Sequence, residues 1–188
     1  MTTACRFAVK GPLLLLLCSS AISAQNFRVT LLGTGSPIPI SDRSGPSTLV
    51  EAGAEKLLID CGRGASVRLW QLHIPLGQVT AVFLTHLHSD HIVGIPDLWL
   101  TGWLPPPFGH HTGQFRIWGP LGTQEMMTNL QKAFQPDFRF RAADGIPPEG
   151  IAVLAQDVTK GGLRKERSQS YRFRSRSRDG EAGLRLPH

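Results

Sequence analysis

A run of histidines directly after a buried strand constrains this 188-residue chain more than any other feature. The near-continuous apolar run at 79–84 is typical of a buried strand, and the segment T-H-L-H-S-D-H at 85–91 follows it at once. Alternate side chains of an extended segment point to the same side, so His86 and His88 can bind one metal ion together. The spacing therefore predicts a metal site at the end of a strand.

Asp90 and His91 lie where the chain is expected to turn into a helix, and they can bind a second ion beside the first. Neutral imidazole and carboxylate ligands suit zinc, and also manganese or iron. Two such ions about 3.5–4 Å apart can hold a phosphoryl or acyl oxygen and lower the pKa of bound water towards about 7. A solvated, histidine-rich surface loop is the alternative, and the spacing favours metal binding over it.

Short strands alternate with helices along most of the chain. The expected strands are at 27–32, 48–51, 56–59, 79–84, 114–118, 138–141 and 151–158, and the expected helices are at 65–72, 91–103 and 123–134. This alternation predicts an α/β layered domain. Trp99, Trp103 and the loop Pro105–Phe108 either form a substrate rim near the metal helix or are core and turn residues.

Several motifs in a fixed order resemble one protein family. The segment His86–His91 matches the H-x-H-x-D-H signature of the metallo-β-lactamase superfamily. The flanking motifs resemble its ribonuclease Z and arylsulfatase-like branch, and they are L-L-G-T-G-S-P at 31–37, L-I-D-C-G at 58–62, G-I-P at 94–96 and W-G-P-L-G-T at 118–123. The likeness runs from about Phe27 to Val158.

The resemblance implies an αββα sandwich with two metal ions, zinc in the first instance, at the edge of its inner sheets. His86 and His88 then bind the first ion, and Asp90 and His91 bind the second. Asp90 also orients or deprotonates the attacking water. Asp60 either forms hydrogen bonds near the ligands or caps the glycine-rich turn that follows it. The family's fold has two αβ halves, so we expect this chain to be a truncated, N-terminal half of the sandwich.

The first 24 residues resemble a secretory signal peptide. Arg6 and Lys10 are followed by a short leucine-rich core and by small residues at 19–24, a pattern typical of a cleaved export signal. The apolar run is too short to cross a bilayer, which takes about 20 residues. We therefore expect a periplasmic or secreted protein without a transmembrane segment.

The net charge of +6 lies mostly at the two ends of the chain. Residues 25–161, the expected metallo-β-lactamase-like domain, carry ten basic and eleven acidic residues. Because this domain is near neutral, we do not expect nucleic acid to be a partner. Residues 162–188 carry eight basic and three acidic residues. This Arg/Ser tail has three interpretations: a polyanion-binding tail, a disordered tail, or the product of a one-base frameshift near Gly161. The shifted frame can encode a hairpin pattern and a D-H-G motif.

Three functional hypotheses remain. The first is an exported metal-dependent hydrolase of phosphodiesters or other esters, acting through metal-bound hydroxide on a small-molecule or phosphodiester substrate. The second is an endoribonuclease that processes tRNA 3′ ends, as in ribonuclease Z. The third is a truncated product without catalytic activity. Because the second-half ligands are not recognised, we expect an open, weakly held metal site with low activity.

Overall fold

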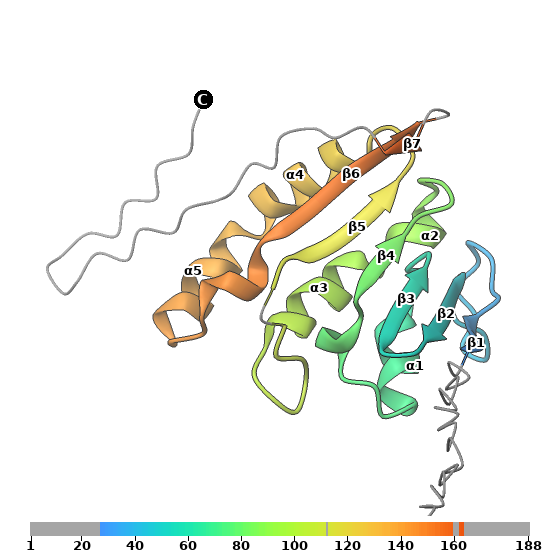
Figure 1. The fold of residues 1–188 in the computed structure, drawn as a ribbon, viewed down its shortest axis with the longest axis horizontal. Helices are drawn as coiled ribbons and strands as arrows, with labels where there is room; N and C mark the ends of the chain where they lie inside the picture. Colours follow the sequence, from blue (N-terminus) through green and yellow to red (C-terminus); the bar gives the residue numbers. More distant parts are fainter. Residues whose placement is uncertain (1–26, 112, 160–161, 164–188) are drawn as a thin grey trace, which may run out of the picture.

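The computed structural model describes residues 27–111, 113–159 and 162–163. The strands are β1 (Phe27–Gly33), β2 (Ser47–Ala52), β3 (Glu55–Ile59), β4 (Ala81–Phe83), β5 (Phe115–Gly119), β6 (Val153–Thr159) and β7 (Gly162–Leu163). The helices are α1 (Ala65–Gln71), α2 (Ser89–Ile92), α3 (Ile95–Trp103), α4 (Thr123–Ala133) and α5 (Gln135–Ala143), with 3-10 turns η1 (Leu76–Gln78) and η2 (Pro148–Ile151). Figure 1 shows these elements along the chain.

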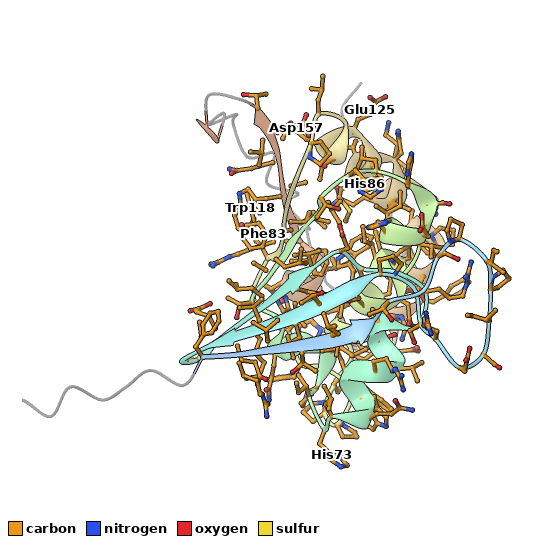
Figure 2. The ribbon with its side chains drawn as sticks, turned by 90° about the vertical axis from the view of Figure 1, so that its right-hand side faces the viewer. His73, Phe83, His86, Trp118, Glu125 and Asp157 are labelled. Carbon is orange, nitrogen blue, oxygen red and sulfur yellow. The ribbon has the colours of Figure 1, made fainter. Side chains whose placement is uncertain are left out.

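The strands lie side by side in the order in which they occur in the sequence. Strands β1 to β3 are antiparallel, and β2 and β3 form a hairpin whose two-residue turn contains Gly53 at a φ of +61°. Strands β3 to β6 are parallel. Parallel neighbours need a crossover, and crossovers of one hand place their helices on the same face of the sheet. Figures 1 and 2 show the helices together on one face.

The hydrophobic core lies between this sheet and its helices. Leu49, Leu58, Val82 and Ile117 are neighbours across β2 to β5, and each is fully buried. The helix layer contributes a second set of buried apolar side chains, chiefly from α1 and α3: Ala65, Leu69, Ile95, Leu98, Trp99 and Trp103. The α/β prediction is confirmed, with one sheet and one helix layer as expected for half of an αββα sandwich.

The other face of the sheet is apolar and open in the described part of the chain. Side chains on this face alternate with those of the core, because successive residues of a strand point to opposite faces. Leu31 is 67% exposed and Phe83 is 36% exposed. The rings of Phe83 and Trp118 stack with their centroids 5.3 Å apart, and Figure 2 labels both on the side of the sheet away from the helices.

Three of the expected elements differ from the structure. Residues 138–141 were expected to form a strand but belong to α5, because only Phe138 is buried whereas Phe140 is 72% exposed. The expected helix at 91–103 is divided into α2 and α3 at Val93 and Gly94. The buried strand at 79–84 is shorter, since β4 covers only its central part.

The two ends of the chain lie largely outside the described residues. This applies to the expected signal peptide at 1–24 and to most of the tail at 162–188. The expected boundary after residue 161 falls within a strand pair, because Leu163 of β7 pairs with Val158 of β6. Among the described residues, none of the helices has the length and apolar character needed to span a membrane.

A close backbone approach at Gly62 joins the end of β3 to the histidine segment. A methyl group at Gly62 would lie 2.5 Å from the carbonyl oxygen of Asp90 and 2.6 Å from the carbonyl carbon of Gly45. Both neighbours are backbone atoms, so the chain must shift to admit a side chain.

We predict that Gly62→Ala lowers the free energy of unfolding by about 1–3 kcal/mol, the usual cost of overpacking. Urea unfolding followed by far-UV circular dichroism measures the change. Gly113→Ala is the matched control, because no atom lies within 4 Å of the position of its added methyl group. Equal losses in the two variants would contradict the close approach.

Candidate metal centre

The carboxyl ends of β3 and β4 bring Asp60 and the histidine segment together. The N–H of Asp60 donates to the carbonyl of Phe83 at 2.8 Å, which continues the parallel pairing of the two strands by one residue. The N–H of Cys61 donates to the carbonyl of His91 at 2.8 Å. Residues that follow parallel strands share one edge of the sheet, where α/β folds place their functional groups. The structure therefore places Asp60 beside the predicted ligands.

Three imidazole rings gather at this edge. Nε2 of His86 lies 3.1 Å from Nδ1 of His88, and the ring centroids of His86 and His91 are 3.9 Å apart. Two nitrogen ligands of a tetrahedral zinc ion lie about 3.4 Å apart, since each Zn–N bond is about 2.0–2.1 Å. The His86 and His88 nitrogens are thus near the separation that one shared ion requires, and this pair fits a metal ion.

Asp90 and His91 form a second pair of potential ligands. Oδ2 of Asp90 lies 3.7 Å from Nε2 of His91, and the Asp90 residue is only 8% exposed. In the part of the chain that the structure describes, no three His, Cys, Asp or Glu side chains are arranged around one point as metal ligands. The four predicted ligands are therefore close together as two pairs, and each pair is an incomplete site.

The buried carboxylate of Asp60 holds this arrangement in place. Its Oδ2 lies 2.8 Å from Nδ1 of His91, and its Oδ1 accepts the backbone N–H of Thr85 at 2.8 Å. The Thr85 hydroxyl lies 2.8 Å from Oδ2 of Asp60. Of the two roles that the sequence left open for Asp60, the structure supports hydrogen bonding near the ligands. Thr85 was not among the predicted site residues, although its place between strand and first histidine was a usable signal.

Cys61 lies at the same strand end but is a core residue. Its side chain is fully buried, and burial raises the pKa of the Cys61 thiol well above its ordinary value. The thiolate is the reactive form of cysteine, so burial makes this side chain inert.

We predict that iodoacetamide leaves Cys61 unmodified in the native protein and alkylates it in denaturant. Peptide mapping by mass spectrometry measures the modification of the peptide that contains Cys61. Rapid alkylation of Cys61 in the native state would contradict its burial in the core.

The substrate rim suggested for Trp99, Trp103 and the proline-rich loop is wrong. Trp99 is 1% exposed and Trp103 is 3% exposed, so both are core residues. The loop Pro105–Phe108 follows the far end of α3, a nine-residue helix about 13 Å long that begins beside the histidine segment. A hollow of about 200 Å³ lies at that far end, away from the histidine segment, and its lining includes Trp103, Pro105, His110 and His111. Figure 2 likewise labels His73 at the opposite end of the molecule from His86.

The chain is similar to known proteins over a stretch that includes this edge of the sheet. The family described as "Anti-Pycsar protein Apyc1" matches residues 27–104. Ribonuclease Z of Mycolicibacterium gilvum is 45% identical over 136 residues, which are 71% of this chain and 46% of that protein. Over these residues the chain is a ribonuclease Z-like member of the metallo-β-lactamase superfamily. Ribonuclease Z of Mycobacterium bovis is 48% identical over 115 residues, which are 61% of this chain and 41% of that protein. The chain spans about half the length of these relatives.

Two solved structures are similar to part of the chain. Human tRNase Z, short form, is 30% identical with a TM-score of 0.48, over 56% of this chain and 38% of that chain. The metallo-β-lactamase fold protein YhfI from Bacillus subtilis is 27% identical with a TM-score of 0.47, over 56% of this chain and 41% of that chain. The expectation that nucleic acid is not a partner is at odds with the curated relatives, because they are named as ribonucleases.

Proposed function

We propose that this chain carries the metal-binding edge of a phosphodiester hydrolase of the ribonuclease Z type, with RNA as its substrate class. The observation that carries the proposal is the convergence of His86, His88, Asp90 and His91 at one edge of the sheet. The 45% identity to Ribonuclease Z of Mycolicibacterium gilvum supports RNA as the substrate. This identity favours the ribonuclease Z-like function over the first hypothesis, an exported hydrolase of phosphodiesters or other esters.

In this proposal His86 and His88 hold one metal ion, and Asp90 and His91 hold a second. Zinc suits these ligands best, while manganese and iron are the alternatives. When bound, such ions supply Lewis-acid activation of a phosphoryl group and of water. Among the described residues each pair is an incomplete site, so we expect these four side chains by themselves to bind metal weakly.

Asp90 has the position of the general base in this proposal. Its carboxylate is nearly buried and faces the imidazole of His91. It orients a water molecule towards the phosphorus and accepts the proton of that water as the new P–O bond forms. The P–O bond to the ribose oxygen breaks, and the departing oxygen takes a proton from solvent. Asp60 acts indirectly, through His91. Its hydrogen bond to Nδ1 of His91 leaves the other ring nitrogen, Nε2, free to bind metal.

A test of the proposal compares two variants of exposed histidines in the purified full chain. His88→Asn removes a proposed ligand, whereas His73→Asn changes an exposed histidine at the other end of the molecule. We expect zinc binding, measured by equilibrium dialysis, and cleavage of a precursor tRNA to fall in the first variant only. Zinc binding without cleavage of any phosphodiester would support the non-catalytic alternative. Equal behaviour of the two variants would overturn the site.

The pattern at 1–24 favours a second candidate, an exported hydrolase of small phosphodiesters or esters. Export separates an enzyme from the tRNA of the cytosol, so the two candidates predict different compartments and different substrates. Cell fractionation and the mass of the mature N-terminus decide the compartment. Cleavage of a bis-aryl phosphodiester without cleavage of precursor tRNA would favour the exported hydrolase.

A further inference from the structure

The Thr85 hydroxyl lies between the buried carboxylate and the first histidine. Its Oγ1 is 2.8 Å from Oδ2 and 3.0 Å from Oδ1 of Asp60, and it is 2.9 Å from Nδ1 of His86. The backbone N–H of Thr85 also donates to Oδ1 of Asp60 at 2.8 Å. The backbone N–H and the hydroxyl of Thr85 thus both bind the Asp60 carboxylate, and together they fix the position of the hydroxyl.

The direction of the protons follows from the chemistry of the three groups. An ionised carboxylate only accepts hydrogen bonds, and a hydroxyl has one proton to donate. The Thr85 proton therefore points to Asp60, and the Thr85 oxygen accepts from Nδ1–H of His86. The opposite arrangement would turn the hydroxyl lone pairs towards carboxylate oxygens 2.8 and 3.0 Å away, where two acceptors face each other.

We propose that Thr85 is a positioning residue that keeps the proton of the His86 imidazole on Nδ1 and leaves a lone pair on Nε2, towards His88. The proposal rests on the proposed function, in which His86 and His88 bind one metal ion. The hydrogen bond of one ring nitrogen sets which nitrogen is free to bind a metal. Asp60 thus orients two imidazoles, that of His91 directly and that of His86 through the Thr85 hydroxyl.

The contact from Asp60 through the Thr85 hydroxyl to His86 can be tested by substituting Thr85. Thr85 is exposed, so Thr85→Val removes the hydroxyl and keeps the branched shape without opening a core cavity. Thr85→Ser keeps the hydroxyl and is the conservative variant. Thr80→Val is a matched control, because the Thr80 hydroxyl oxygen accepts the N–H of Lys56 at 3.0 Å at the other end of β4.

The first measurement is made on the metal-free protein. Long-range ¹H–¹⁵N NMR correlations at a pH where the imidazoles are neutral show which ring nitrogen of His86 carries the proton. We expect Nδ1–H in the unaltered chain, in Thr85→Ser and in Thr80→Val, and a loss of that preference in Thr85→Val. Unchanged Nδ1–H in Thr85→Val would overturn the proposal, whatever the chain does with metal.

The second measurement is the dissociation constant for zinc, obtained by competition with a chromogenic chelator. We expect it to rise about tenfold or more in Thr85→Val, within the usual range for lost hydrogen-bond partners of metal ligands, and to stay close to that of the unaltered chain in Thr85→Ser. Equal weakening in both Thr85 variants would show a merely structural role and overturn the proposal. If the unaltered chain binds no zinc, the proposed function fails, while the NMR result still decides the role of Thr85.

Discussion

Asp60→Asn is expected to weaken metal binding at the proposed site strongly, although it removes none of the proposed ligands. Three donors converge on this buried carboxylate: the backbone N–H and hydroxyl of Thr85, and Nδ1 of His91. An asparagine amide has one oxygen, so its NH₂ group must face at least one of these donors. The backbone of residue 60 has a φ of +60°, which Asn tolerates as well as Asp does.

We expect the zinc dissociation constant of Asp60→Asn to rise by about 10- to 100-fold, and any phosphodiester hydrolysis to fall with it. The free energy of unfolding falls by about 1–3 kcal/mol, because a buried donor loses its acceptor. Zinc competition and urea unfolding measure the two effects.

Asp157→Asn is the matched control for this variant. Asp157 lies near the carboxyl end of another parallel strand, where its Oδ1 accepts the backbone N–H of Gln124 at 3.0 Å. An asparagine can accept the same hydrogen bond, so we expect little change in zinc binding. A similar loss of zinc affinity in both variants would show that carboxylates at this edge act through their general charge and not through hydrogen bonds to the ligands.

Trp99→Ala is expected to have the largest effect on stability. Trp99 is 1% exposed, its indole N–H donates to the carbonyl of Ile151 at 3.2 Å, and its ring packs edge to face on Phe138 with centroids 5.5 Å apart. Truncating a buried tryptophan to alanine lowers the free energy of unfolding by about 3–5 kcal/mol. The total free energy of unfolding of a small domain is about 5–15 kcal/mol, so the variant loses much of its stability.

Urea unfolding followed by far-UV circular dichroism measures this loss. Circular dichroism is preferable to fluorescence, because each variant removes one of the four tryptophans and so changes the fluorescence signal itself. Trp70→Ala is the control, since Trp70 is 48% exposed and stacks only on Phe108 among aromatic residues of the described chain. A loss in Trp70→Ala as large as that in Trp99→Ala would contradict the assigned core.

The sequence allowed most of the elements to be predicted where one periodicity dominated. The hairpin around Gly53 and the helix at 123–134 were predicted to within one or two residues. The segment 138–141 failed because F-R-F-R alternates like a strand, while the structure buries Phe138 alone and pairs Arg141 with Asp137 one helical turn earlier. Local alternation does not say which aromatic residue reaches the core, and tertiary packing decides that.

The candidate site was predictable as far as it is local in the sequence. His86, His88, Asp90 and His91 fall within six residues, so their proximity needs no knowledge of the fold. The bonds from Asp60 to Thr85 and His91 span 25 and 31 residues, and they depend on the parallel pairing of β3 with β4. The substrate rim suggested for Trp99 and Trp103 was also a matter of the fold. Both residues follow the histidine segment closely in sequence, but α3 turns their side chains into the core.

The parallel pairing of β3 with β4 also sets the order in which the chain can assemble. The β2–β3 hairpin closes over a two-residue turn, whereas Leu57 of β3 meets Ala81 of β4 only after the intervening helix has folded back. Contacts between residues far apart in sequence form slowly, because loop closure costs entropy first. Asp60 therefore meets His91 only after that crossover has closed. A folding chain that exposes its histidines early can meet metal ions before Asp60 orients His91, because that contact waits for the pairing of β3 with β4.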